Sequence, residues 1–297
     1  MTATFLPLSP SKWKSLGKWF DFDGKRIFYR EEGTGETLLC IHGFPTASWD
    51  WHTIWQDLAA DYRLIAPDLL GFGFSDKPTG RPYSILEQAD MIQSLLKDLG
   101  IMQVHILAHD YGDTVAQELL RRYDEIKEEA QKLSIRSICF LNGGLFPETH
   151  RPLLIQKLFM SPIGFLIGKL MSRKKLAHNL RSIIGSESEF SDQVIDHLWE
   201  LIQYNNGTAV AHRLIRYMKE RITYREAWVG ALQKTAVTIC IINGVEDPIS
   251  GRHMVNRYRE LIPNPVIYEL EGVGHFPSLE DPKQLLSKLG IYHASIR

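Results

Sequence analysis

Asp110 is the residue whose type and position point most directly to chemistry. It stands in the sequence Ala-His-Asp-Tyr-Gly (108–112), between an apolar, β-prone run at 104–107 and a helical pattern at 113–120. Enzymes with a G-x-S-x-G motif present a serine nucleophile at such a strand–turn–helix corner. An aspartate needs no base there, because a carboxylate with a pKa near ~4 is ionised at neutral pH. Such a carboxylate can open a strained ring or displace halide at saturated carbon, which leaves an alkyl ester that water must hydrolyse.

The alternative for Asp110 is purely structural. An Asp at the start of a helix is favoured because its side-chain oxygen caps the first turn and its charge suits the positive end of the helix. The surrounding strands decide between these two interpretations.

Four further apolar runs are typical of buried strands, and each leads into polar or potentially catalytic residues. His42 follows the first run, Asp247 follows the third and His275 follows the fourth. Open α/β sheets bind ligands at the carboxyl ends of their strands. The pattern therefore predicts an α/β fold with a site along that edge. The four runs are residues 37–41, 62–67, 237–242 and 266–270.

With these motifs in order, the chain resembles the α/β-hydrolase superfamily, in particular its Asp-nucleophile branch of epoxide hydrolases and haloalkane dehalogenases. The similarity extends from the strand near Ile27 to the final helix, and nucleophile, acid and histidine follow in the order typical of this fold. Four stretches look most like the mesoderm-specific transcript protein group, namely residues 42–51, 71–78, 109–113 and 142–152.

This resemblance implies a mostly parallel central sheet flanked by helices, with a helical lid inserted into it. The first part of the core would cover residues 1–146, the lid residues 147–228 and the second part of the core residues 229–297. Two helical patterns, at 152–160 and 192–202, fall inside the expected lid.

The resemblance also implies roles for individual residues. Asp110 would be the nucleophile, His275 the base that activates water, and Asp247 the acid that orients His275. The backbone N–H groups of Phe44 and Tyr111 would form the oxyanion hole for the ester carbonyl. Each has a simpler interpretation: a histidine can be an ordinary surface or core residue, and Asp247-Pro can be only a turn.

Neighbouring residues provide the alternatives to these assignments. Glu246 is the nearest competitor of Asp247. In some dehalogenases the acid follows the strand that corresponds to 135–141, but this chain has Asn142 there, which cannot act as a carboxylate. His42 is assigned to the substrate site, where it would organise the oxyanion loop, and His109 is expected to pack and to form hydrogen bonds.

Departures from the family pattern bear on the substrate. Tyr111 stands where many members of this branch have Trp, and Phe44 occupies a loop that often carries Asn, so both side-chain donors that hold a departing halide are altered. Epoxide opening instead needs an acid from the lid, for which Tyr217 is the best candidate and Tyr204 its partner, with Tyr224 nearby. The alternative for these tyrosines is ordinary amphipathic packing.

The sequence therefore predicts a cofactor-independent hydrolase of a small apolar organic substrate, with epoxide hydrolysis as the leading reaction and haloalkane dehalogenation as the second. A third interpretation is a non-catalytic binding or regulatory protein on the same scaffold. No metal-ligand spacing or phosphate-binding loop is present, so we expect no cofactor and no metal.

Composition limits the partners and the compartment. The net charge of -1 and the pI near 6.8 do not favour nucleic acid. Cys40, Cys139 and Cys240 lie in separate apolar runs, which is typical of reduced thiols in a cytoplasmic protein. Residues 5–20 mix Trp with Lys and allow membrane-surface contact, but packing beside the first strand is favoured. The apolar run at 158–171 is too short to span a bilayer and is expected to line the mouth of a substrate tunnel.

Overall fold

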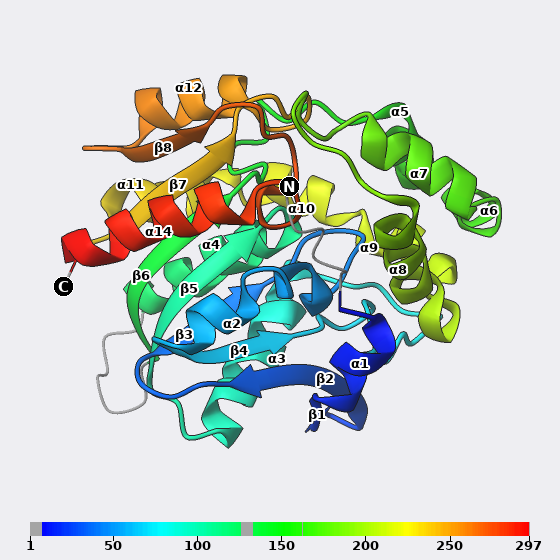
Figure 1. Cartoon of the computed structure of the whole chain (residues 1–297), viewed down its shortest axis with the longest axis horizontal. Helices are drawn as coiled ribbons and strands as arrows, with labels where there is room; N and C mark the ends of the chain where they lie inside the picture. Colours follow the sequence, from blue (N-terminus) through cyan, green and yellow to red (C-terminus); the bar gives the residue numbers. More distant parts are fainter. Residues whose placement is uncertain (1–7, 126–132, 162, 297) are drawn as a thin grey trace, which may run out of the picture.

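The computed structural model describes residues 8–125, 133–161 and 163–296, and in these residues one sheet of eight strands forms the centre of the molecule (Figure 1). The order across the sheet is β1-β2-β4-β3-β5-β6-β7-β8. β2 pairs antiparallel with β1 and β4, and all the later pairs are parallel. The strands are β1 (Lys18–Phe22), β2 (Lys25–Glu32), β3 (Thr37–Ile41), β4 (Arg63–Pro67), β5 (Gln103–His109), β6 (Ser134–Leu141), β7 (Thr238–Gly244) and β8 (Val266–Leu270).

Alternate side chains of the central strands belong to two separate hydrophobic cores, one on each face of the sheet. In β3, Leu39 and Ile41 join the core beneath α3, α4, α11 and α12, whereas Leu38 and Cys40 join the core beneath α1, α2 and α14. This two-residue alternation follows from the pleat of a strand. Both faces of the sheet are therefore covered, which explains why the central strands read as unbroken apolar runs.

Short and long helices cover the two faces. Cys40, Cys139 and Cys240 are buried in β3, β6 and β7 as free thiols. None of the described helices is long and apolar enough to cross a membrane. The covering helices are α1 (Pro10–Ser15), η1 (Ser48–Trp51), α2 (Trp55–Ala59), α3 (Ile85–Asp98), α4 (Tyr111–Glu125), α11 (Arg225–Lys234), α12 (Arg252–Leu261), α13 (Pro277–Glu280) and α14 (Pro282–Ile296).

Between β6 and β7 the chain leaves the sheet and forms a run of helices, here called the inserted helices. α5 to α8 stand off one end of the sheet in Figure 1. The predicted boundary at residue 228 falls inside α11, which already packs on α4. The inserted helices are α5 (Leu154–Met160), α6 (Gly164–Lys169), α7 (Arg173–Arg181), α8 (Asp192–Gln203), η3 (Tyr204–Ala209), α9 (Ala211–Leu214) and α10 (Tyr217–Thr223).

The described part of the N-terminal segment packs beside the first strands, as the sequence favoured. Trp13 is buried, and its indole N–H donates to Ser48 at 3.1 Å. Its ring lies against Trp55 and under the guanidinium of Arg30. The segment is therefore anchored to the core rather than presented as a free amphipathic helix; residues 1–7 lie outside the described part of the chain.

Candidate active site

Asp110 occupies the sharp turn between β5 and α4. Its φ of 46° lies in the left-handed region that non-glycine residues rarely adopt. The turn also requires Gly112, because a Cβ there would come within 2.3 Å of the carbonyl oxygen of Ile41 in β3. Strand and helix can cross this closely only with a glycine at that position. The predicted strand–turn–helix corner is thus present, with Asp110 at its apex.

The Asp110 carboxylate is buried, and its two oxygens lie in different surroundings. Oδ2 accepts a hydrogen bond from the backbone N–H of Phe44 at 3.1 Å. Oδ1 accepts one from the hydroxyl of Tyr217 at 3.4 Å and lies 3.7 Å from Nη2 of Arg221. Burial raises the pKa of Asp110, but the charges of His275 and Arg221 outweigh it, so the net effect is a lowered pKa. Asp110 is therefore an anion at neutral pH.

Of the two backbone groups predicted for an oxyanion hole, the Phe44 N–H contacts this carboxylate directly and the Tyr111 N–H belongs to the next residue along the chain. Phe44 follows β3 and donates to Asp110, as described above. Tyr111 is the first residue of α4, so its N–H has no carbonyl partner within the helix. The side chain of Tyr111 packs against the rings of Phe72 and Tyr217.

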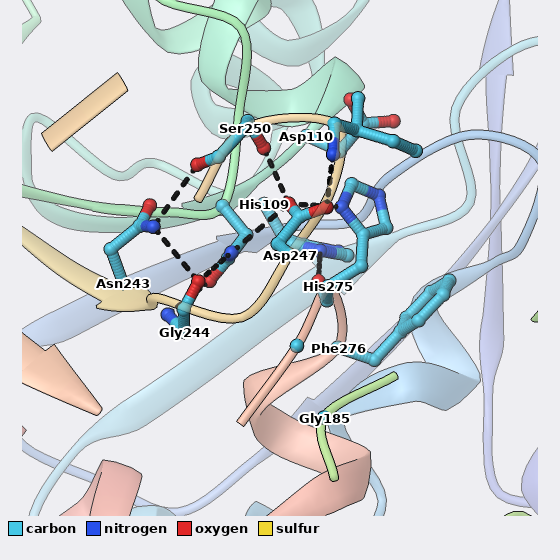
Figure 2. Close-up of polar contacts among 12 residues, drawn as sticks. His109, Asp110, Gly185, Asn243, Gly244, Asp247, Ser250, His275 and Phe276 are labelled. Atoms are coloured by element: carbon cyan, nitrogen blue, oxygen red, sulfur yellow. Dashed lines mark hydrogen bonds and ion pairs between the residues drawn. The ribbon is translucent and has the colours of Figure 1, made fainter. Parts of the chain in front are cut away.

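His275 and Asp247 form a buried pair near Asp110 (Figure 2). Nδ1 of His275 lies 2.8 Å from Oδ2 of Asp247. Asp247 follows β7 and also accepts from the hydroxyl of Ser250 and the N–H of Ile249, both at 2.7 Å. Burial raises the pKa of Asp247, but the charge and hydrogen bond of His275 with these two donors outweigh it and lower the pKa to about 2.

The same pair controls the protonation of His275. Burial lowers its pKa, but the charge and hydrogen bond of Asp247 and the charge of Asp110 outweigh burial and raise the pKa to about 9. While both carboxylates are anionic, His275 is therefore a doubly protonated, positively charged imidazolium at neutral pH.

Glu246, the sequence competitor of Asp247, points elsewhere. Its carboxylate is exposed and accepts from the N–H and hydroxyl of Ser186 at 2.6 and 3.0 Å. The acid beside His275 is thus Asp247.

Asn142 has a structural role that the sequence did not suggest. Its Nδ2 donates to the carbonyl of Gly244 at 2.9 Å and to Asp247 at 3.1 Å, and its Oδ1 accepts from the Gly244 N–H at 2.7 Å. It therefore ties the end of β6 to the end of β7 and holds Asp247 in place. His109 packs and forms hydrogen bonds as predicted, since its Nε2 donates to the backbone carbonyl of His275 at 2.7 Å.

Two residues assigned to the substrate site do not line the cavity described below, and their polar groups are used within the protein. His42 is fully buried, its Nδ1 donates to the carbonyl of Gly43 at 2.8 Å, and its Nε2 accepts from the N–H of Leu69 at 3.0 Å. Both ring nitrogens are thus engaged in holding the loops after β3 and β4, which agrees with the predicted role of His42 in organising the oxyanion loop and leaves neither nitrogen for the substrate. Tyr204 accepts from Lys14 at 2.9 Å and packs on Phe74, so the predicted pairing with Tyr217 is not seen. The physical reason is that η3 turns Tyr204 toward α1.

Arg221 is the main residue that the sequence interpretation missed. Its Nη2 donates to the Asp110 carbonyl at 2.9 Å and its Nε to the hydroxyl of Thr114 at 2.7 Å. Its guanidinium also lies 4.5 Å from the ring centre of Tyr217. The available signal was spacing: Arg221 follows Tyr217 by four residues, so both lie on one face of α10.

A cavity of about 330 Å³ opens above Asp110 and His275. Its walls are almost entirely apolar and come mainly from the inserted helices, including Phe159, Ile167 and Met171 from the run predicted to line a tunnel. Tyr111, Tyr204 and Tyr217 are not among the described residues that line it, although the Tyr217 hydroxyl lies 3.4 Å from Oδ1 of Asp110, which does. In the described part of the chain, no cluster of three or more His, Cys, Asp or Glu residues is placed to hold a metal ion.

Comparison with known proteins places this geometry in a wider context. Residues 36–282 match the family described as alpha/beta hydrolase fold. The mesoderm-specific transcript protein of Mus musculus is 41% identical over 296 residues, which covers 94% of this chain and 87% of that protein.

Two solved structures share the fold. "Epoxide hydrolase CorEH without ligand" is 19% identical, with a TM-score of 0.75 over 95% of this chain and 99% of that one. The haloalkane dehalogenase DbeA-M1 loop variant of Bradyrhizobium elkanii is 20% identical, with a TM-score of 0.77 over 94% and 96%. At these identities the likeness concerns the fold alone.

Proposed function

The chain belongs to the α/β-hydrolase family, and from this premise we propose that it hydrolyses a small apolar epoxide through a covalent ester on Asp110. The observation that carries the proposal is the position of the Asp110 carboxylate between the Tyr217 hydroxyl, the Phe44 N–H and the His275–Asp247 pair.

In the first step, Oδ1 of Asp110 attacks a ring carbon. Oδ2 accepts the shorter hydrogen bond, from the Phe44 N–H at 3.1 Å, whereas the contact of Oδ1 with the Tyr217 hydroxyl is 3.4 Å long, so we assign the attack to Oδ1. The new bond joins Oδ1 to carbon, and the carbon–oxygen bond of the ring breaks. Tyr217 lies beside Oδ1, and burial together with the charge of Asp110 raises its pKa. It therefore keeps its proton until the more basic ring-opened oxygen forms and takes that proton.

In the second step, water hydrolyses the ester. Esterification removes the charge of Asp110, which is one of the causes of the raised pKa of His275. The His275 imidazolium then releases its second proton to solvent more readily, and the neutral imidazole accepts a proton from the attacking water, while Asp247 stabilises the imidazolium that forms again. The oxyanion develops on Oδ2, where the Phe44 and Tyr111 N–H groups would stabilise it. Collapse of the tetrahedral intermediate breaks the bond between Cγ and Oδ1, and the proton that His275 took from water goes to the departing oxygen of the diol. The proton of the new carboxyl group goes to the Tyr217 phenolate, which restores the Asp110 carboxylate, and His275 takes back a proton from solvent.

Substrate class follows from the cavity. Its wall is formed mainly by aliphatic and aromatic side chains; Asp110 and His275 lie at the wall together with a few polar side chains of the inserted helices and the segments between them, namely Gln156, Ser172, Lys175 and Asn179. Such a wall favours an apolar substrate and excludes water from the reacting atoms. We infer that the inserted helices act as the lid of this site.

The proposal favours epoxide opening over dehalogenation. A departing halide needs hydrogen-bond donors beside the reacting carbon, but the two positions that often supply them carry Phe44 and Tyr111 here, and the Tyr111 ring is packed against Phe72 and Tyr217. Epoxide opening needs one acid beside the attacking oxygen, a place that the Tyr217 hydroxyl occupies.

The test is to trap the ester. We expect His275→Gln, incubated with a panel of epoxides and haloalkanes, to gain the full mass of an epoxide on Asp110, because attack needs no base and hydrolysis does. The matched control is the double variant His275→Gln with Asp110→Asn, which should gain no mass.

Three results would redirect the interpretation. An adduct that has lost halide would favour dehalogenation. An adduct on another residue would remove Asp110 as the nucleophile. A folded protein that binds members of the panel without forming any adduct would favour a non-catalytic binder.

A further inference from the structure

The outer surface of α5 and α6 carries a concentration of exposed apolar side chains. Six of the eleven exposed large hydrophobic residues of the described chain lie between residues 154 and 170. Leu154 is 73% exposed, Leu170 59% and Phe165 49%. Scattered exposed apolar residues are normal, but a contiguous group marks a contact surface. We call this group the apolar patch: Leu154, Leu158, Ile163, Phe165, Leu166 and Leu170.

Two close helix contacts hold the apolar patch together. A Cβ on Gly164 would come within 2.0 Å of the Phe159 carbonyl oxygen, so α6 begins against the end of α5. A Cβ on Gly168 would come within 2.4 Å of the Thr208 carbonyl oxygen, so α6 also lies on η3. The apolar patch is therefore one surface built by two packed helices.

The charged side chains of the segment that carries the apolar patch have a single sign. Although the whole chain has a net charge of -1, residues 151–181 contain no Asp or Glu. They contain seven basic residues: Arg151, Lys157, Lys169, Arg173, Lys174, Lys175 and Arg181.

Only part of this charge is neutralised within the protein. Arg173 and Arg181 form ion pairs with Asp192 and Asp196 of α8. Lys157, Lys169 and Lys174 are exposed, and none of them takes part in an ion pair among the described residues. These three lysines therefore leave a net positive field around the apolar patch.

The apolar patch continues into the cavity. Leu158 and Leu170 belong to the exposed surface and also line the cavity wall above Asp110 and His275. Lys175 lies at the same wall, with its ammonium donating to the Leu170 carbonyl at 2.9 Å. In Figure 1, α5, α6 and α7 stand together at the outer end of the molecule, away from the sheet.

We propose that the apolar patch docks on the surface of an anionic lipid bilayer. Aliphatic and aromatic side chains insert into the boundary between headgroups and acyl chains, and surrounding lysines bind anionic headgroups. A second copy of the chain fits less well, because a symmetric contact through this surface would bring like charges together. Docking in this orientation puts the cavity mouth against the bilayer.

If the proposed function holds, this surface also restricts the class of substrate. An apolar epoxide partitions into lipid, so a cavity that opens at the bilayer would receive it without transfer through water. The substrate class would then be a membrane-partitioned, lipid-like epoxide.

The experiment is co-sedimentation of the whole protein with vesicles. The probes are vesicles of phosphatidylcholine alone and of phosphatidylcholine with phosphatidylserine at about seven to three. We expect binding to the anionic vesicles that weakens as salt is raised, because exposed charges are screened. Binding needs no substrate and no turnover, so its failure is separate from a failure of the proposed reaction.

Charge variants test the lysines. Replacing three patch lysines by Glu should weaken binding by about fivefold or more per residue, since each basic residue near such a surface contributes roughly one kcal/mol. A control variant with the same change of charge on other elements should bind as the parent does. The patch set is Lys157, Lys169 and Lys174, and the control set is Lys97, Lys234 and Lys283.

Apolar variants test insertion in the same way. Replacing patch residues by Ser should reduce binding at least tenfold, whereas exposed apolar residues elsewhere should tolerate the change. The patch set is Leu154, Ile163 and Leu166, and the control set is Met102, Ile222 and Ile291.

The proposal is overturned if anionic vesicles do not bind the parent protein, or if the two control variants weaken binding as much as the patch variants. Concentration-dependent dimers that the patch variants abolish, without vesicle binding, would assign the apolar patch to a second copy of the chain.

Discussion

Replacing Asp247 by Asn should lower the pKa of His275, because the Asp247 carboxylate stabilises the positively charged imidazolium. The carboxylate lies 2.8 Å from Nδ1 of His275, and asparagine keeps its shape without the charge. In the parent protein the pKa of His275 is raised to about 9, against burial, by Asp247 and Asp110. Because folding raises this pKa, the contribution of His275 to stability is full below about pH 6.5 and declines as the pH rises through 9.

The magnitude follows from Coulomb's law. Unit charges 2.8 Å apart in an effective dielectric of about 20 interact by about 6 kcal/mol. That energy corresponds to about four pKa units and is a ceiling, because the neutral amide oxygen still accepts a hydrogen bond. Opposite charges at such distances usually shift a pKa by about one to three units. We therefore expect the pKa of His275 in Asp247→Asn to fall to about 6 to 8.

The assay is NMR titration of the histidine ring signals, with the signal of His275 identified by its loss in His275→Gln. Glu246→Gln is the matched control, because Glu246 is the adjacent residue in the chain and bonds to Ser186 rather than to His275. It should leave the pKa of His275 within a few tenths of a unit of the parent value.

Two results would refute the reasoning. An unchanged pKa in Asp247→Asn would mean that the pair does not hold the proton. An equal shift in Glu246→Gln would mean that the general charge of the loop, and not the contact, sets the pKa.

Three further predictions follow from other contacts. Asp110→Asn should lower the pKa of His275 by about one unit or more in the same titration, because esterification has the same effect on charge; an unchanged value would remove the proposed link between the two steps. Tyr217→Phe should slow epoxide opening by about 10²-fold or more in single-turnover assays, whereas Tyr204→Phe should not, since its hydroxyl binds Lys14; equal losses would contradict the assignment. Burial raises the pKa of Asp50 from 3.8 to about 8, so the folded state holds a proton that the unfolded state releases, and stability should fall as the pH rises between these values. Asp50→Asn should reduce this fall, which is measured as the difference in the free energy of unfolding by urea between pH 5 and pH 8. The same difference in the parent protein and in Asp50→Asn would contradict the raised pKa.

The sequence by itself determined the local features of the site. Asp110 at its corner, and Asp247 and His275 after their strands, were found because a strand end, a tight turn and a helix start are encoded within a few neighbouring residues. Parallel strands bring their carboxyl ends to one edge, so residues far apart in the chain could be expected to meet there. The structure brings Asp247 and His275 into contact.

Only the tertiary structure decided which side chains of the inserted helices reach that edge. Tyr204 and Tyr217 looked alike in sequence, yet the first turns to Lys14 and the second to Asp110. The contact of Asn142 with Asp247 and that of Arg221 with Asp110 were not anticipated, because the two partners in each pair lie about a hundred residues apart in the chain. Helix periodicity says which residues share a face, but the rotation and docking of each helix are fixed by packing against the whole core, and no short stretch of sequence contains that information.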